Sequence, residues 1–166
     1  MFQHLLHEAD IRIPLEASSR EGALAELIAT LPSFKFSAQQ KSNLLEVLLQ
    51  REFFESTAVG NQLALPQCVL PGIEAPFFLM GISRKGIMFP SQDGQPVHFV
   101  FLSVFPEKSG EAVRRYSLLH EIEIFFNDPF LRERLKICET PEEVCEIFVR
   151  ESQTAFPPQQ FRFRNS

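Results

Sequence analysis

The segment that begins at Arg51 gathers side chains that can bind an anion. Arg51 carries a planar, permanently charged guanidinium group, which can donate two parallel hydrogen bonds to an oxyanion. Ser56 and Thr57 add hydroxyl groups, which can donate to the same anion or simply cap the local turn. The guanidinium of Arg51 also has an alternative use, an ion pair with a nearby carboxylate: Glu52 or Glu55. The segment therefore predicts either an oxyanion site or a polar turn.

The four histidines lie outside this segment, since none occurs between His7 and His98. His98 falls inside an apolar run, where a structural role is expected. The three cysteines form no Cys-x-x-Cys pair, and no histidine and cysteine spacing matches a metal site. We expect reduced thiols, no metal and no cofactor. The cysteines are Cys68, Cys138 and Cys145.

Several short motifs occur together: Arg51-Glu52, Ser56-Thr57, Gly60-Asn61 and Ala64-Leu65-Pro66-Gln67. This pattern resembles the signature of the fructose/mannitol-class enzyme IIA domains of the bacterial phosphotransferase system, which reads Arg-Glu, Ser-Thr, Gly-Asn-Gly, Ala-Ile-Pro-His. The segments Asp93–Val97 and Phe126–Asp128 also resemble family motifs, and the resemblance extends over about His4 to Glu151. The Gly60-Asn61 pair and the length look closest to the nitrogen-regulatory branch, whose members act without an attached transport domain.

In that family the histidine after the proline carries the phosphoryl group, and Gln67 stands at this position. A neutral imidazole offers a nucleophilic nitrogen lone pair, while its other nitrogen can donate a positioning hydrogen bond. The lone pair of a carboxamide nitrogen is delocalised into the carbonyl, so Gln67 cannot form a stable phosphoramidate. A shifted motif is the alternative, but no neighbouring histidine can substitute. The resemblance therefore implies a phosphocarrier scaffold without its acceptor atom.

The family has a second histidine at the start of the helix after the long strand, and alignment puts Arg115 there, or Arg114 if the register slips. His120 falls five residues later, about 140° around a helix, so we expect it to face elsewhere. Arg51 and Arg115 then face one pocket beside the Gly60-Asn61 loop. The candidate anion- or partner-binding residues are Arg51, Ser56, Thr57, Gly60, Asn61, Pro66, Gln67 and Arg115.

Three hypotheses about function remain open. The first is a phosphorylation-incompetent regulator that constantly binds the partners of an unphosphorylated enzyme IIA. The resemblance implies phosphotransferase-system proteins, transporters, channels and sensor kinases as such partners. The second is a small-anion sensor that uses Arg51 and Arg115, and the third is an active carrier with a displaced histidine such as His120. No phosphate-cradling glycine loop or nucleophile elbow suggests an enzyme of another kind.

Capping signals place two helices before this segment. Ser18 with Glu21 fits a capping box before an apolar face that ends at Pro32, and Ser37 with Gln40 fits a second box. Short β-prone runs follow, separated by proline and glycine. They are Leu63–Leu65, Phe77–Ile82 and Val97–Phe105.

The last third of the sequence returns to helices. Residues 111–127 form one, Asp128-Pro129 begins the next, and Thr140-Pro141 with Glu143 begins a third. The run Val97–Phe105 is apolar almost throughout, as expected of a central strand buried on both faces. The order of elements predicts an α/β fold, a mixed sheet flanked by helices on both faces.

Size and charge limit the class of protein. The 166 residues carry a net charge of −5, which disfavours a nucleic-acid partner. No apolar run is long enough to span a membrane, and the N-terminus lacks signal-peptide features. We expect one cytoplasmic domain over residues 1–151 and a flexible tail over residues 152–166.

Overall fold

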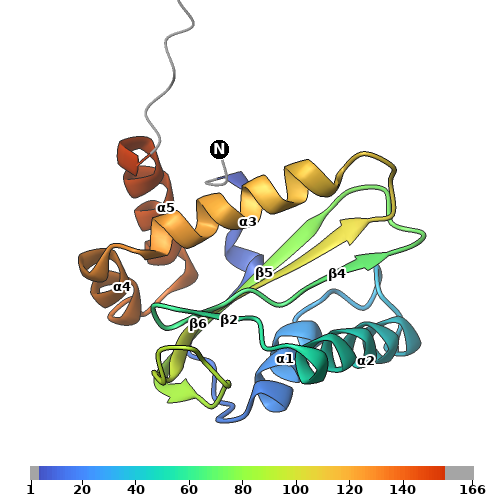
Figure 1. The fold of residues 1–166 in the computed structure, drawn as a ribbon, viewed down its shortest axis with the longest axis horizontal. Coiled ribbons are helices and arrows are strands. Elements are labelled where there is room, and N and C mark those ends of the chain that lie inside the picture. The colour runs from blue at the N-terminus through green and yellow to red at the C-terminus, as the bar shows by residue number, and fades with distance from the viewer. Residues whose placement is uncertain (1–3, 156–166) are drawn as a thin grey trace, which may run out of the picture.

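A six-stranded mixed sheet lies between two layers of helices (Figure 1). The computed structural model describes residues 4–155, with side chains described up to Glu151. In sheet order the strands are β1 (Ile11–Arg12), β5 (Phe77–Ile87), β6 (Val97–Pro106), β3 (Leu63–Ala64) and β2 (Ala58–Gly60), with β4 (Gln67–Leu70) also on β6. β5 is antiparallel to β6, whereas β3 and β4 are parallel to it. The predicted mixed sheet is confirmed.

The helices form the two outer layers. Under one face lie α1 (Arg20–Ala29) and α2 (Ala38–Phe54) (Figure 1). The other face carries the short 3-10 helix η2 (Glu8–Asp10) together with α3 (Ala112–Phe126), α4 (Pro129–Lys136) and α5 (Pro141–Ala155). α5 runs four residues past the predicted boundary at 151, and the rest of the predicted tail, residues 156–166, lies outside the described residues.

The central strand β6 supplies side chains to both cores. Phe99, Phe101 and Phe105 pack under α3, α4 and α5, whereas the alternate residues of β6 pack against α1 and α2. This alternation follows from the period of two along a strand. Burial of each such side chain contributes about 1.5–3 kcal/mol to folding. The apolar run at 97–105 thus forms the predicted strand buried on both faces.

The helix caps confirm one predicted box and correct another. The Ser37 hydroxyl accepts a hydrogen bond from Gln40 N–H at 3.1 Å, and the side-chain oxygen of Gln40 accepts one from Ser37 N–H at 2.8 Å. The predicted box of Ser18 and Glu21 is wrong: Ser19 is the cap, and Glu21 pairs with its neighbour Arg20. The carbonyl of Ser18 accepts from Met88 N–H at 3.1 Å, which ties this residue to the sheet and delays the helix by one position.

The later helices begin where the sequence predicts. Asp128 accepts from Phe130 N–H at 2.9 Å, with Pro129 in the first helical position. Thr140 accepts from Glu143 N–H at 3.3 Å, but the Glu143 carboxylate reaches back to Glu139 N–H rather than to Thr140. The predicted bond of the Glu143 carboxylate to the backbone of Thr140 is therefore wrong, because the acceptor reaches the preceding residue.

β3 and β4 pair in succession with one edge of β6. Leu63 lies opposite Phe99, and Gln67 lies opposite Ser103. Pro66 lies between the two short strands, and its carbonyl accepts from Ser103 N–H at 2.9 Å. The backbone therefore delivers Gln67 to the first position of a strand, next to the helix that follows β6.

Candidate functional site

Gln67 is half-buried in a hollow of about 330 Å³ where three elements meet. Arg51 comes from the last turn of α2, and Arg115 comes from the first turns of α3. The structure thus brings together the three residues at the centre of the predicted site. We call this feature the arginine hollow; its lining residues are Val47, Arg51, Gln67, Cys68, Val69, Arg115 and Tyr116.

The two candidate arginines of α3 have different surroundings. Arg115 stacks on aromatic rings, with its guanidinium carbon 5.8 Å from the ring centre of Phe105 and 5.5 Å from that of Tyr116. Arg114 is exposed and lies 3.9 Å from the carboxylate of Glu111. Arg115 is therefore the arginine that faces the hollow.

The ion pair that Arg51 forms with a nearby carboxylate is weak. Its guanidinium donates to the backbone carbonyl of Glu55 at 3.3 Å and lies 4.0 Å from the Glu55 carboxylate. The Glu55 side chain is 75% exposed, so water screens this pair, and such pairs contribute about 0–1 kcal/mol. The charge of Arg51 is therefore still available to a ligand in the hollow.

Thr57 is not available to an anion, which corrects one predicted role. Its hydroxyl donates to Glu52 at 2.6 Å, and its backbone N–H donates to the same carboxyl group at 3.0 Å. Both residues are buried. The Ser56 hydroxyl accepts from Ala58 N–H at 3.2 Å, in the manner of a turn cap. Glu52, Thr57 and Ser56 therefore build the turn that leads into β2.

The Gly60-Asn61 pair forms a left-handed turn. Gly60, Asn61 and Gln62 have φ angles of 90°, 53° and 65°. Positive φ suits glycine and asparagine but is unfavourable for glutamine. The carbonyl of Gln62 accepts from two N–H groups of β6, at 2.8 and 3.0 Å, and these bonds hold the turn in place.

Two distant motifs hold the same turn. Asn61 N–H donates to the Asp93 carboxylate at 3.0 Å, and its side-chain amide donates to Asn127 at 2.8 Å. We call residues 60–62 the Asn61 loop. It lines a hollow of about 130 Å³ with α3 and does not line the arginine hollow. The buried Pro66 likewise serves the sheet through its bond from Ser103.

His120 lies closer to Gln67 than we predicted. Both residues line a further hollow, which also contains Arg51 and Tyr116. The helical angle of about 140° between Arg115 and His120 was a poor guide to the position of His120. Tyr116 lines both hollows, and His120 lies one helical turn after Tyr116 on the same face. His120 is 70% exposed, and its Nδ1 lies 3.7 Å from the Glu123 carboxylate.

The remaining titratable groups do not extend the site. The Nδ1 of His98 lies 2.7 Å from the Ser83 carbonyl, within the sheet, in line with its predicted structural role. Burial raises the pKa of Cys68 to about 12, so this thiol stays protonated beside the hollow. Among residues 4–155 no three histidine, cysteine or acidic side chains form a group that could hold a metal.

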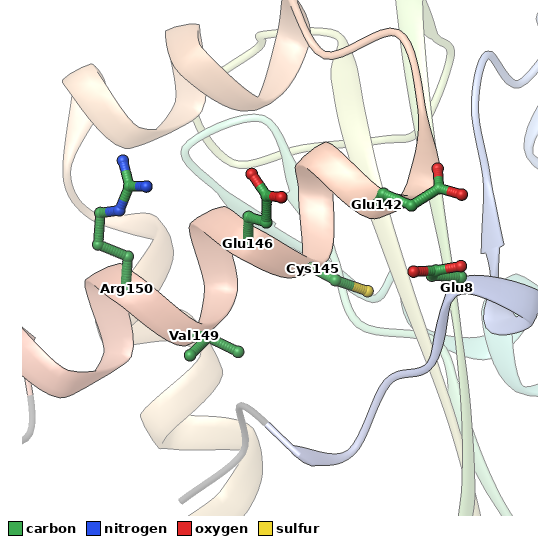
Figure 2. A pocket seen from close by; sticks show the side chains of 6 residues that line it. All are labelled: Glu8, Glu142, Cys145, Glu146, Val149 and Arg150. Carbon is green, nitrogen blue, oxygen red and sulfur yellow. The ribbon is translucent and has the colours of Figure 1, made fainter.

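Another hollow, of about 570 Å³, lies beside α5 and η2, away from Gln67 (Figure 2). Glu8, Glu142 and Glu146 surround it with negative charge, and Arg150 is the one cationic residue among the described residues that line it. Burial, with the nearby Glu8, raises the pKa of the Cys145 thiol, which disfavours the reactive thiolate. This hollow therefore suits neither an anion nor thiol chemistry.

The fold is that of an enzyme IIA domain. Residues 4–151 match the family described as phosphoenolpyruvate-dependent sugar phosphotransferase system, EIIA 2, and the chain belongs to this family. It is 42% identical over 96 residues to a nitrogen regulatory protein of Bradyrhizobium diazoefficiens, a match that covers 58% of this chain and 61% of that protein.

Solved structures share this fold. The crystal structure of the nitrogen regulatory protein IIA-Ntr from Neisseria meningitidis superposes with a TM-score of 0.78 at 24% identity, over 89% of this chain and 98% of that one. Mannitol enzyme IIA of Escherichia coli, in its complex with phosphorylated enzyme IIB, gives a TM-score of 0.68 at 16% identity, over 87% and 97%. The predicted family and its likeness to nitrogen regulatory proteins are confirmed.

Sequence reasoning did not identify several residues around Gln67. Val47, Val69 and Tyr116 line the arginine hollow, although no motif marks them. Only Tyr116 could have been predicted from the sequence, because it directly follows Arg115 on the helix.

Within residues 4–155 no helix is both long and apolar enough to cross a membrane.

Proposed function

We propose that this chain is a phosphorylation-incompetent member of its family, which binds partner proteins through the surface around Gln67. The observation that carries the proposal is an amide in the hollow that Arg51 and Arg115 flank. In-line attack on phosphorus needs an available lone pair, and the amide nitrogen of Gln67 does not offer one. The resemblance implies that relatives carry their acceptor histidine at this position.

His120 is a poor substitute acceptor. His120 does not line the arginine hollow, so Arg115 would not help to hold a phosphoryl group on its ring. A phosphoryl group on this exposed ring would also be largely open to water. Its place on the rim of the neighbouring hollow nevertheless makes it the residue to remove in a labelling experiment.

The rim of the hollow supports protein binding. Val47, Val69 and Tyr116 are 38%, 37% and 65% exposed, and Val59 nearby is 41% exposed. Apolar and aromatic side chains around a polar centre are typical of protein interfaces. The partners we propose are phosphotransferase-system proteins, such as an enzyme IIB, or a transporter or sensor kinase, in the cytoplasm.

Constant binding follows from the missing acceptor. Phosphorylation adds a charge of about −1.5 to −2 and changes which surfaces fit together. A chain that cannot accept this charge remains in the state of an unphosphorylated enzyme IIA. A change in its own abundance, or competition from a relative that can be phosphorylated, would then change how much of the partner it occupies.

A labelling experiment tests the proposal. The chain is incubated with phosphoenolpyruvate, labelled in the phosphoryl group, and the general phosphotransferase proteins, with an active enzyme IIA as positive control. We expect no acid-labile label on this chain. Stoichiometric label that disappears in His120→Ala would overturn the proposal and identify His120 as the acceptor.

The variant Gln67→His tests the cause directly. It restores an imidazole between Arg51 and Arg115, so we expect label to appear at position 67 while the starting protein stays unlabelled. His120→Ala combined with Gln67→His should be labelled equally well. Failure of both proteins with Gln67→His, although folded by circular dichroism, would show that Gln67 is not what prevents transfer.

A further inference from the structure

The hollow beside α5 and η2 combines an apolar strip with an acidic rim (Figure 2). Cys145 and Val149 lie one helical turn apart on α5, and Figure 2 shows both side chains on the same side of the helix. Cys145 packs against the hydrophobic core, whereas Val149 is 40% exposed. Glu8 of η2 and Glu142 and Glu146 of α5 supply the rim. We call this feature the α5 hollow.

The rim carboxylates are not neutralised within the described part of the chain. No basic side chain of residues 4–151 lies within 4.0 Å of the carboxylates of Glu8, Glu142 or Glu146. By contrast, Glu151 on the same helix pairs with Arg134. Because a single guanidinium lines the hollow, its described lining carries an excess of two negative charges.

The carboxylates act on the apolar strip as well as on the rim. Burial is the largest cause of the raised pKa of the Cys145 thiol, and the charges of Glu8, Asp10 and Glu142 raise this pKa further. Their negative potential therefore converges on Cys145. A positively charged group placed there would be attracted by all three carboxylates.

The chain itself contains a segment with matching chemistry. Phe161-Arg162-Phe163-Arg164 lies outside the described residues, in the sequence that follows α5. In an extended conformation side chains alternate between two sides, so both rings face one way and both guanidinium groups the other. Two aromatic rings match the apolar strip, and two positive charges match the excess negative charge of the lining.

This segment is long enough to reach the α5 hollow. Val149 and Cys145 precede the last residue of α5, Ala155, by about 9 and 15 Å along the helix axis. Pro157-Pro158 cannot continue the helix, so the chain can turn back after α5. From Ala155 to Arg164 an extended chain spans about 30 Å, which leaves length for the turn.

We propose that the segment Phe161–Arg164 docks in the α5 hollow of the same chain. Its rings cover Cys145 and Val149, and its arginines lie at the rim carboxylates. The covalent connection raises the effective concentration of the segment to about the millimolar range, so modest contacts are enough. The docked segment closes the acidic face of α5 and η2 to other basic segments. The docking is independent of Gln67 and of phosphoryl transfer.

Nuclear magnetic resonance of the full chain tests the docking. Nuclear Overhauser effects are expected between the ring protons of Phe161 or Phe163 and the methyl groups of Val149. The amide order parameters of residues 161–164 should resemble those of rigid backbone, about 0.85, rather than the values below about 0.6 of a flexible segment. Flexible amides without these Overhauser effects would overturn the proposal.

Two double variants test the charges on either side of the contact. Arg162→Gln with Arg164→Gln should abolish the Overhauser effects and make the segment flexible. Glu142→Gln with Glu146→Gln should lower the docking equilibrium constant about three- to tenfold, because two partly exposed ion pairs are lost. Unchanged amide shifts in the rest of the chain confirm that each variant is folded.

Glu74→Gln with Glu107→Gln is the matched control for the rim variant. It removes two charges from exposed residues that do not line the α5 hollow, so docking should stay unchanged. A loss equal to that of the rim variant would show a general effect of net charge and overturn the proposed contact.

A peptide of residues 159–165 separates the possible occupants. It should bind the variant Arg162→Gln with Arg164→Gln about tenfold more tightly than the starting protein, whose hollow is already occupied. Equal binding to both proteins, or no binding to either, would overturn the proposal. Overhauser effects that vanish on about twentyfold dilution would assign the segment to a second copy of the chain, and would overturn docking within one chain.

Discussion

The Asn61 loop and the arginine hollow lie near each other beside α3, but they use their polar groups differently. The polar groups of Asn61 in the loop bond to other residues of the same chain. Asp93 accepts from the backbone N–H of Asn61, and Asn127 accepts from the side-chain amide of Asn61. In the hollow Arg115 has aromatic neighbours and no carboxylate partner among the described residues. The polar groups of Asn61 are bonded within the fold, although the side-chain oxygen of Gln62 is buried without a hydrogen-bond partner among the described residues. The guanidinium of Arg115, in contrast, retains its capacity to bind.

This contrast shows which residues of the family motif the fold itself needs, whatever residue stands at position 67. Glu52, Thr57 and Asn61 hold the turns that connect α2 to the sheet, so the fold needs them whether or not transfer occurs. The residue at position 67 makes no such contact with the turns. Under the proposed function, glutamine at this position prevents phosphoryl transfer while the scaffold keeps its shape.

The largest expected effect is a difference in the free energy of unfolding between a variant of the turn before β2 and a variant of the arginine hollow. Thr57→Val removes the hydroxyl that donates to the buried carboxyl group of Glu52, which should lower the free energy of unfolding by about 1–3 kcal/mol. Arg115→Gln, on a partly exposed surface, should change it by less than about 0.5 kcal/mol. Urea denaturation of both variants measures the difference.

Thr57→Ser serves as the matched control, because it retains the hydroxyl and loses only a methyl group. It should recover most of the stability that Thr57→Val loses. Equal losses in Thr57→Val and Arg115→Gln would mean that the two regions do not differ in this way.

The sequence predicted the scaffold better than the site. Capping signals and the apolar run at 97–105 located most helices and the central strand, since these patterns act within a few residues. The short strands β1 and β2 carry too little pattern to be predicted, whereas β3 lies within the predicted run Leu63–Leu65. β5 extends to Ile87 through a bulge after Ile82, where polar residues interrupt its apolar run.

The sequence analysis named the site residues that belong to the family motif. It missed the residues that reach the hollow only through tertiary packing. Arg51 and Gln67 came from the motif, and Arg115 came from an alignment that left Arg114 open. His120 was misplaced because a helical angle does not give the width of the face that borders a hollow. Thr57 was misassigned because its partner Glu52 becomes buried only when the sheet has formed.

A smaller effect is expected for the contact between Asn61 and Asn127. A double-mutant cycle of Asn61→Gly and Asn127→Ala isolates this bond of 2.8 Å. Glycine tolerates the positive φ of position 61, so the variant removes the amide without adding backbone strain. We expect a coupling energy of about 0.5–1.5 kcal/mol from urea denaturation. A coupling near zero would mean that α3 does not help to hold the loop.

The smallest effect concerns the acid side of the stability profile. Hydrogen bonds from the Ser91 hydroxyl, the Gln95 N–H and the Asn61 N–H lower the pKa of Asp93. A carboxyl group whose pKa is lower in the folded state stabilises the fold above its unfolded pKa of about 3.9 and loses this contribution as the pH falls through the folded value.

Asp93→Asn removes this titration and keeps the shape of the side chain. The difference in free energy of unfolding between the two proteins should therefore be constant near neutral pH and shrink below about pH 4. Other carboxyl groups with lowered pKa values, such as Glu133, titrate equally in both proteins and cancel. Parallel curves down to the acid transition would show that Asp93 does not stabilise the Asn61 loop through its charge, and that the loop is held by its neutral contacts alone.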